Sequence, residues 1–314
     1  MDINKHKFLM LRILKDIFTD TRLAPLLAFK GGTSLMFFYG LPRFSTDLDF
    51  NLLDRTKEQA VFDKVAAILS KYGTVADSNM KFNGPIAVLD YGVGERKLKV
   101  EISNREYGNH YEMKNLSGID MTLMQKPDMF AHKLCALLDR KGITGRDVYD
   151  CYFFLSNNTP INQDIVEYRM GKPLADYLQD CIEALRKYSD KAIMSDIGEL
   201  LTEKDKDFVR AKMRTETISL LGFFKDYPLI AEYPDSKMHV EAAAVYEQGD
   251  GKFAVRATID SREYPGKEMA GSDAQAFKEL GKESEQEAFG KLMAKKYFIK
   301  EWNMNNGHRD SVKK

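Results

Sequence analysis

Two aspartates separated by one residue are the residues of this sequence best placed to do chemistry. Asp47 and Asp49 lie in the segment 46–53, where apolar and polar residues alternate as in a β-strand. Because side chains of a strand alternate between its faces, both carboxylates project from one face, while Leu48 and Phe50 project from the other. A divalent cation such as Mg²⁺ or Mn²⁺ would remove their repulsion, since it prefers oxygen ligands. The alternative is a solvated edge strand without a metal.

A glycine pair upstream of the aspartates is suited to phosphate binding. It lies in the segment that reads Lys30, Gly31, Gly32, Thr33 and Ser34. A helix is predicted to begin after the glycines, and the backbone N–H groups at a helix N-terminus favour phosphate oxygens through hydrogen bonds and the helix dipole. The alternative is an ordinary turn.

Charged residues farther along the chain are candidates for the same site. Glu101 lies on the polar face of a strand predicted over 97–102, where it is either a third metal ligand or half of an ion pair with a lysine. Lys133 lies on the apolar face of a predicted helix, where it either pairs with a nucleotide phosphate or extends to solvent. Asp147 lies at the start of the next predicted helix, which it is expected to cap, with Asp150 one turn further on.

The elements that must position these residues change in character along the chain. Residues 1–125 interleave helical and strand-like patterns, which indicates mixed α and β structure, and residues 126–232 are helical throughout. The expected helices of the first part are 5–20, 33–39 and 56–71, and its expected strands are 26–29, 46–53 and several pieces of 74–103. The apolar stripe of one later helix consists of Leu174, Leu178, Cys181, Ile182 and Leu185.

The last part, residues 236–302, is predicted to be a β-hairpin followed by a long helix. Apolar residues alternate in two segments on either side of a glycine-containing turn at 249–251. A single long helix is expected from Ser272, which has the spacing of a capping box with Gln275. Residues 303–314 are expected to form a basic tail.

The composition argues against several classes of protein. The chain has 314 residues, of which 44% are hydrophobic and 30% charged, as in a globular protein rather than a disordered or membrane protein. The 47 Lys and Arg residues balance the 47 Asp and Glu residues, so any binding of nucleic acid must be local. No apolar run approaches the ~18 residues of a membrane span, and no signal peptide is expected. The three widely spaced cysteines predict a reduced, cytoplasmic protein.

The order of these motifs resembles that of the AbiEii/AbiGii abortive-infection toxins, which belong to the polymerase β-like nucleotidyltransferases. The motifs are Gly-Gly-Thr-Ser, Arg-x-Ser-x-Asp-Leu-Asp, a strand carboxylate, an apolar-face lysine and Arg-Asp-x-Tyr-Asp. The resemblance covers about residues 10–160 and extends more loosely to about 230. It implies an α+β fold with a catalytic core (1–125) built on a mixed sheet flanked by helices. A helical domain (126–232) would complete the active site, and the hairpin-helix unit (236–302) would be accessory.

The resemblance also implies roles for individual residues. The nucleotide-binding residues would be Lys30, Gly31, Gly32, Thr33, Ser34, Arg43, Ser45 and Lys133. The metal ligands would be Asp47, Asp49 and Glu101, and Lys133 and Asp147 would join them as catalytic residues. The strand carboxylate of such enzymes is usually an aspartate, so Glu101 is expected to bind metal differently or to act only as a base.

The implied reaction is the Mg²⁺-dependent transfer of a nucleoside monophosphate from a nucleoside triphosphate to an acceptor hydroxyl. The expected acceptor is RNA, particularly the 3′ end of tRNA, and the chain would be the toxin of a toxin–antitoxin pair with a cognate antitoxin. The alternatives are a transferase that modifies a protein hydroxyl and a non-catalytic nucleotide-binding module. The sequence contains no zinc-protease, nucleophile-elbow or P-loop motif that indicates another chemistry.

Overall fold

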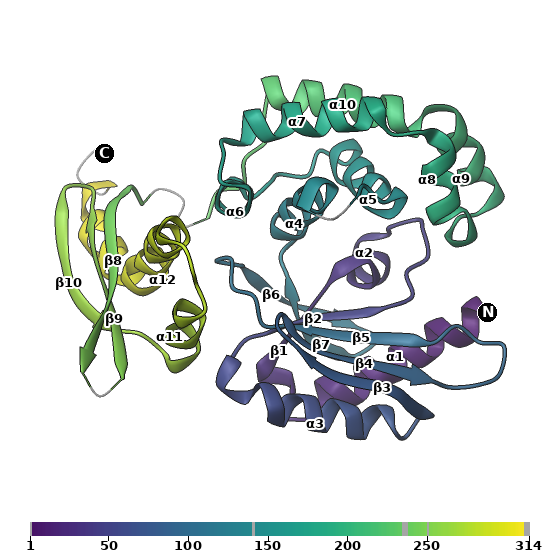
Figure 1. The fold of residues 1–314 in the computed structure, drawn as a ribbon, viewed down its shortest axis with the longest axis horizontal. Helices are drawn as coiled ribbons and strands as arrows, with labels where there is room; N and C mark the ends of the chain where they lie inside the picture. Colours follow the sequence, from purple (N-terminus) through teal and green to yellow (C-terminus); the bar gives the residue numbers. More distant parts are fainter. Residues whose placement is uncertain (1, 140–141, 234–237, 250, 311–314) are drawn as a thin grey trace. The chain divides into compact units, whose positions relative to one another are not determined.

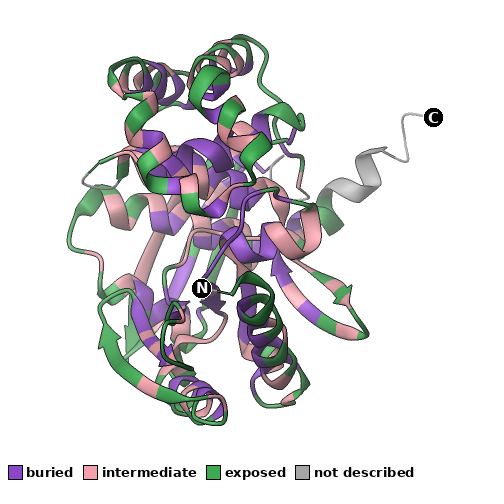
Figure 2. Cartoon of the chain, turned by 90° about the vertical axis from the view of Figure 1, so that its right-hand side faces the viewer, coloured by how far each residue is buried: buried purple, intermediate pink, exposed green. Residues whose placement is uncertain are grey.

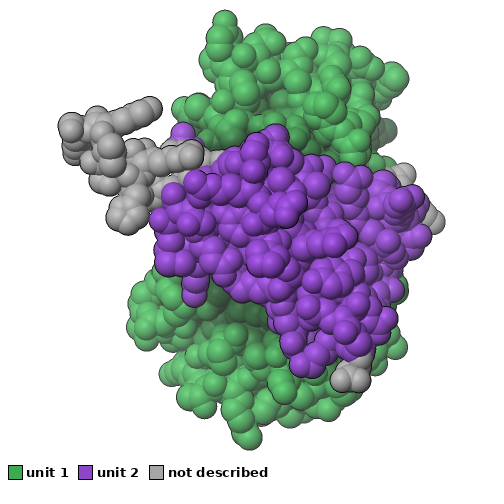
Figure 3. Space-filling model, turned by 90° about the vertical axis from the view of Figure 1, so that its left-hand side faces the viewer, with its two compact units in different colours: residues 1–105, 109–231 green, residues 106–108, 232–314 purple. Residues whose placement is uncertain are grey.

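The chain folds into two compact units in a computed structural model (Figures 1 and 3). Unit 1 comprises residues 1–105 and 109–231, and unit 2 comprises residues 106–108 and 232–314. The structure describes residues 2–139, 142–233, 238–249 and 251–310. Of the basic tail predicted at 303–314, the last four residues lie outside the described part of the chain, and the rest belongs to a helix.

A mixed seven-stranded sheet forms the centre of unit 1, with the strand order β3-β4-β5-β2-β1-β7-β6 among the described residues (Figure 1). Its strands are β1 (Leu27–Lys30), β2 (Leu48–Leu52), β3 (Thr74–Lys81), β4 (Gly84–Asp90), β5 (Leu98–Ser103), β6 (Tyr111–Leu116) and β7 (Ile119–Met124). Strand β2 pairs in parallel with β5 and antiparallel with β1, which in turn pairs in parallel with β7. The predicted mixed sheet is confirmed, whereas the hairpin of β6 and β7 was not predicted.

The hydrophobic core of unit 1 lies between the sheet and two helices, α1 (Ile3–Thr19) and α3 (Glu58–Leu69). These helices cover the same face of the sheet in Figure 1. Leu48 and Phe50 of β2 are fully buried in this core, as the alternation of side chains predicts. The central strands β1, β2 and β5 are largely buried, whereas the edge strand β3 and the outer faces of the helices are exposed (Figure 2). The polar residues of β2 therefore face the other side of the sheet.

Helix α2 (Gly31–Tyr39) lies on that other side of the sheet (Figure 1). The sequence predicts its end at Gly40, and the structure confirms it, because Gly40 is the C-cap with the positive φ of 71° that glycine adopts without strain. No side chain caps the N-terminus of α2 at Lys30. The first turn of this helix therefore remains suited to an external anion.

The second part of unit 1 is helical, as predicted. Its α-helices are α4 (Lys126–Asp139), α5 (Gly145–Ser156), α6 (Gln163–Met170), α7 (Leu174–Lys187), α8 (Asp190–Ile197), α9 (Glu203–Phe208) and α10 (Arg214–Asp226). Shorter helical turns are η1 (Ala24–Leu26), η2 (Arg55–Lys57), η3 (Gly198–Leu200) and the π-helical η4 (Val209–Met213). The predicted apolar stripe of α7 is buried along its whole length.

Unit 2 contains a three-stranded antiparallel sheet in the order β10-β9-β8, followed by two helices. The elements are β8 (Val240–Gly249), β9 (Lys252–Ile259), β10 (Arg262–Glu268), α11 (Gly271–Lys278) and α12 (Glu283–Asp310). The predicted hairpin is present as β8 and β9, and β10 extends it.

The prediction of one long helix from Ser272 is wrong. The helix is interrupted between Lys278 and Glu283, and Gly281 lies in the interruption. Glycine costs about 1 kcal/mol relative to alanine inside a helix, so this position favours a break. Ser272 does not cap α11, because Ala270 occupies the N-cap position.

Two further features of the described residues bear on the sequence predictions. The three cysteines, Cys135, Cys151 and Cys181, are buried free thiols in the helical part of unit 1. Within the described ranges, none of the helices combines the length and the apolar character needed to cross a membrane.

Candidate active site

A row of three charged residues crosses the middle of the sheet. In the parallel pair of β2 and β5, Asp49 lies opposite Glu101, and in the antiparallel pair of β1 and β2 it lies opposite Lys30. Residues paired in register share a face of the sheet, so these three side chains project from the face opposite the core. Asp47, one residue before β2, belongs to the same polar alternation. We call Lys30, Asp47, Asp49, Lys99 and Glu101 the carboxylate face.

The electrostatics of the carboxylate face favour a bound cation. Burial raises the pKa of Asp49 above its usual value, and although Lys99 opposes this, the nearby carboxylates Glu101 and Asp47 raise it further. Burial also lowers the pKa of Lys30 to about 8. Ionising one carboxylate beside other carboxylates is costly, and a divalent cation bound between them offsets that cost. Carboxylates with perturbed pKa values therefore often cluster at functional sites.

Glu101 forms the ion pair with a lysine that was one of the two roles predicted for it from the sequence. It lies opposite Asp49, and its carboxylate also pairs with Lys99 of the same strand, with an Nζ–Oε2 distance of 2.9 Å. Across the described residues, no three or more His, Cys, Asp or Glu side chains are grouped so that they could hold a metal ion. The two aspartates still fit Mg²⁺, which commonly binds one or two carboxylates together with substrate phosphates. Glu101 is not placed as a third ligand here.

Gly31 brings the predicted phosphate loop against the aspartates. Its φ is +82°, and a Cβ at this position would lie 2.5 Å from Oδ2 of Asp49. At Gly32 a Cβ would lie 2.8 Å from both Nη2 of Arg43 and Oγ of Ser45. Both positions therefore require glycine, because any side chain would push the loop away from the residues beside it.

The hydroxyl groups of the loop have partners within the protein. Oγ1 of Thr33 donates to the carbonyl of Asp47 at 2.5 Å, and Oγ of Ser34 donates to the carbonyl of Gly31 at 2.8 Å. Both residues are fully buried. These hydroxyls hold the loop in place, so phosphate contacts here would come from the backbone N–H groups.

A second charged cluster lies between the segment that follows α2 and the helices α4 and α5. Arg43 binds Asp150 through two hydrogen bonds, with Nε–Oδ1 and Nη2–Oδ2 distances of 2.6 and 2.7 Å. Nζ of Lys133 lies 2.8 Å from Asp150 and 3.8 Å from Asp147. Burial alone would raise the pKa of Asp150, but the charges of Arg43 and Lys133 lower it to about 2. We call Arg43, Lys133, Asp147 and Asp150 the paired cluster.

The paired cluster changes the interpretation of several predicted residues. Arg43 and Lys133, expected to bind nucleotide, have carboxylate partners, and only the side chain of Lys133 reaches the surface, with 19% of it exposed. The expectation that Asp147 caps α5 is wrong, because Thr144 occupies the N-cap position and Asp147 lies three residues later. Asp147 instead accepts a hydrogen bond from the Thr144 hydroxyl at 2.8 Å, while its own backbone N–H donates to that hydroxyl at 3.3 Å. Asp150, which the sequence placed one turn after Asp147 without a role of its own, is the centre of the cluster.

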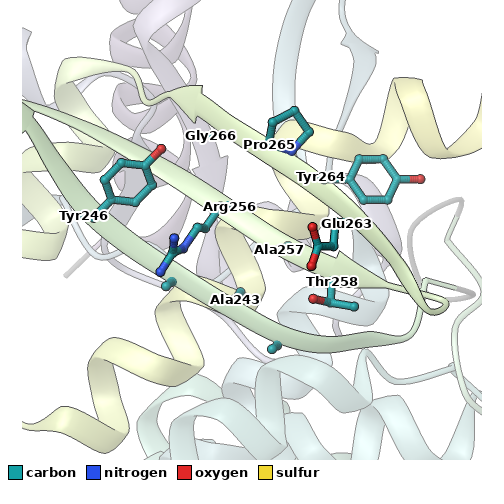
Figure 4. Close-up of a pocket in the computed structure, with 11 residues that line it drawn as sticks. Ala243, Tyr246, Arg256, Ala257, Thr258, Glu263, Tyr264, Pro265 and Gly266 are labelled. Carbon is teal, nitrogen blue, oxygen red and sulfur yellow. The ribbon is translucent and has the colours of Figure 1, made fainter.

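A separate hollow of about 650 Å³ lies on one face of the three-stranded sheet in unit 2 (Figure 4). Tyr246 and Arg256 lie side by side in it, with the guanidinium 5.5 Å from the ring centre. Its floor contains several alanines, and none of the predicted site residues lines it. The candidate active site is therefore confined to unit 1.

Comparison with known families agrees with this geometry. Residues 12–231 match the family described as nucleotidyl transferase AbiEii toxin of type IV toxin–antitoxin systems, so the chain belongs to this family and is a nucleotidyltransferase. The match ends at the last residue of unit 1 and does not include the main part of unit 2. The predicted family is thereby confirmed. No curated protein matches the chain.

Two solved structures resemble the chain more weakly. One is described as a candidate nucleotidyltransferase from H. pylori, is 21% identical, and has a TM-score of 0.44 over 70% of this chain and 96% of that chain. The other, JHP933 from Helicobacter pylori, is 20% identical, with a TM-score of 0.42 over 71% of this chain and 95% of that chain. Family membership rests on the match over residues 12–231.

Proposed function

We propose that this nucleotidyltransferase uses the carboxylate face to transfer a nucleoside monophosphate from a nucleoside triphosphate to an acceptor hydroxyl. The observation that carries the proposal is the row of Lys30, Asp49 and Glu101 across three neighbouring strands. It places two carboxylates and an ammonium group beside the N-terminus of α2. In the cell the chain would act as the toxin of a type IV pair and would be held in check by a cognate antitoxin.

Asp47 and Asp49 would hold the Mg²⁺ ion of this reaction. A bound Mg²⁺ neutralises charge on the phosphoryl oxygens and orients the leaving pyrophosphate. The raised pKa of Asp49 supports this assignment, because burial and the neighbouring carboxylates leave its charge poorly compensated. The backbone N–H groups that follow Gly31 and Gly32 would bind phosphate oxygens at the N-terminus of α2.

Glu101 would accept the proton of the attacking hydroxyl. Burial alone would raise its pKa, but Lys99 and Lys30 lower it below the usual value, so the carboxylate is ionised at neutral pH. An ionised carboxylate within reach of the acceptor is the form that general-base catalysis requires. Lys133 would contact the nucleotide at the exposed edge of the paired cluster, while Asp147 and Arg43 would hold that edge in place.

The acceptor that best fits the site is the 3′ end of an RNA, such as tRNA. Two cationic side chains, Lys30 and Arg105, act on Glu101 and lower its pKa. Positive charge beside the proposed base favours an acceptor that carries phosphate groups over a neutral protein hydroxyl.

The proposal is tested by incubating the protein with each α-labelled nucleoside triphosphate, Mg²⁺ or Mn²⁺, total tRNA and a mixture of proteins. We expect label at the 3′ end of RNA with wild-type protein and about 10²–10³-fold less with Asp49→Asn. Label on protein alone would replace RNA with a protein acceptor. Label that persists undiminished in Asp49→Asn would contradict the site.

A further inference from the structure

Asp47 is carried by a segment without regular secondary structure. Helix α2 ends at Tyr39 and β2 begins at Leu48, and the residues between them belong to neither a helix nor a strand. Because no ladder of backbone hydrogen bonds fixes this segment, the position of Asp47 depends on individual contacts to its peptide groups. We call residues 40–47 the aspartate segment.

The two peptide groups that flank Asp47 are each held by a side chain from another element. Nε2 of His6, on α1, lies 2.9 Å from the carbonyl oxygen of Thr46. Oγ1 of Thr33, on α2, lies 2.5 Å from the carbonyl oxygen of Asp47. The backbone on both sides of the Asp47 side chain is therefore anchored, once from each face of the sheet.

The hydrogen bonds of His6 have only one consistent direction for a neutral ring. A carbonyl oxygen can only accept, so Nε2 carries the proton, and Nδ1 accepts from the hydroxyl of Tyr91 at 2.6 Å. Burial lowers the pKa of His6 and raises the pKa of Tyr91 to about 12, so the ring stays neutral and the hydroxyl stays protonated. A chain of hydrogen bonds thus runs from Tyr91 through His6 to Thr46.

His6 contacts the aspartate segment at a second point. Its side chain is fully buried, and its ring meets that of Phe44 edge to face, with 6.0 Å between the ring centres. His6 precedes residues 12–231, which match the family model, so the family match assigns it no role. Because both ring nitrogens have polar partners, the buried ring is held in one orientation against the aspartate segment.

We propose that His6, oriented by Tyr91, is a positioning residue that fixes the Thr46–Asp47 peptide and thereby aims the Asp47 carboxylate at the metal and nucleotide. The inference rests on the proposed function, in which Asp47 binds the metal. Residues that orient a metal ligand through one intermediate bond typically change metal affinity about 10–100-fold when they are removed.

The test measures Mn²⁺ binding to the full chain in the presence of a nucleoside triphosphate, from the loss of the free Mn²⁺ signal in electron paramagnetic resonance. We expect His6→Leu to weaken Mn²⁺ binding about tenfold or more. His6→Gln should restore much of the affinity, because its amide N–H can replace Nε2 as the donor to Thr46. Tyr91→Phe should weaken binding by a smaller factor.

Tyr72→Phe is the matched control for Tyr91→Phe. The hydroxyl of Tyr72 also bonds to α1, at 3.1 Å from Oδ2 of Asp16, but not to a residue that contacts the aspartate segment. Its Mn²⁺ affinity should equal that of wild type. The inference is overturned if His6→Leu, His6→Gln and Tyr91→Phe all bind Mn²⁺ as tightly as Tyr72→Phe does.

Two further outcomes separate this inference from the proposed function. If Asp47→Asn binds Mn²⁺ as tightly as wild type, the metal site itself is wrong. If Asp47→Asn loses Mn²⁺ and the His6 and Tyr91 variants keep it, only the positioning role fails. Should His6→Leu not fold, the comparison of Tyr91→Phe with Tyr72→Phe decides, since a Mn²⁺ affinity below that of the control supports the inference and an equal affinity overturns it.

Discussion

The paired cluster and the carboxylate face use the same residue types and reach opposite electrostatic results. In the paired cluster, two cations and two carboxylates are matched, and the pKa of Asp150 falls to about 2. On the carboxylate face, burial and neighbouring carboxylates raise the pKa of Asp49 despite two lysines. The first arrangement is complete within the protein, whereas the second gains from a ligand. Charged residues in a fold are thus informative about function mainly where their pairing is incomplete.

The largest effect is expected when the paired cluster is broken. Asp150→Ala would leave Arg43 buried without its bidentate partner, and removing one member of a buried ion pair costs about 3–5 kcal/mol of unfolding free energy. Chemical denaturation measures this loss. The control is Asp180→Ala, which breaks an exposed pair with Lys172 and should cost less than about 1 kcal/mol. Equal losses in the two variants would mean that the paired cluster does not stabilise the fold.

On the carboxylate face the same kind of substitution should change activity instead of stability. Asp49→Asn should lower nucleotide transfer about 10²–10³-fold, as expected when a group that stabilises the transition state is lost. Its melting temperature should stay equal or rise, because the substitution removes repulsion among Asp47, Asp49 and Glu101. Initial rates and thermal unfolding check the two halves of this prediction. A fall in stability with undiminished transfer would assign Asp49 to the core of the protein.

A smaller effect should distinguish two glycines at either end of α2. Gly31→Ala and Gly40→Ala both place a side chain at positive φ, which costs about 1–2 kcal/mol. Only at Gly31 would the new Cβ collide with Asp49, while at Gly40 it meets nothing within 4 Å. We therefore expect equal or greater destabilisation for Gly31→Ala and a loss of nucleotide transfer only in that variant. Loss of transfer in both would implicate the helix as a whole.

The smallest effect concerns the charge of Lys30. Its pKa is lowered to about 8, so the cationic fraction falls as pH rises through 8, and nucleotide affinity should fall with it. Calorimetric titrations between about pH 7 and 9 should show a decline of up to about tenfold for wild type and a flatter profile for Lys30→Met.

The lowered pKa of Lys30 also predicts that the unfolding free energy rises with pH, whereas nucleotide affinity falls. Between pH 8 and the ordinary lysine value of 10.5, the unfolded chain binds more protons at Lys30 than the folded chain does. The contribution of Lys30 to unfolding free energy therefore increases with pH in this window. Parallel pH profiles of wild type and Lys30→Met, both in affinity and in stability, would show that burial does not perturb this lysine.

Much of the carboxylate face could be predicted because its signals are local. The alternation around Asp47 and Asp49 shows which side of the strand they occupy, and the glycine pair at 31–32 marks the start of a helix whose end at Gly40 is equally visible. The register that places Glu101 opposite Asp49 could not be predicted, since it depends on the parallel pairing of β2 with β5. The hydrogen bond from Arg43 to Asp150 joins residues 107 positions apart, so the sequence around neither residue could predict it.

Other errors had local physical causes. The hairpin of β6 and β7 was missed although Ile119, Met121 and Leu123 alternate with polar residues, and its edge strand β6 contains no buried residue, with Met113 63% exposed. The interruption at Gly281 separates two segments that share one helical periodicity, which made them resemble a single helix.

The burial of all three cysteines has a practical consequence for labelling. Burial raises the pKa of Cys135 and Cys181 to about 12 and that of Cys151 well above its usual value, so reactive thiolate is scarce at neutral pH. Maleimide reagents should therefore leave the folded wild-type chain largely unmodified. A single cysteine introduced at an exposed residue near the carboxylate face would then carry one fluorophore without removal of the native thiols, and its emission would follow nucleotide binding in real time.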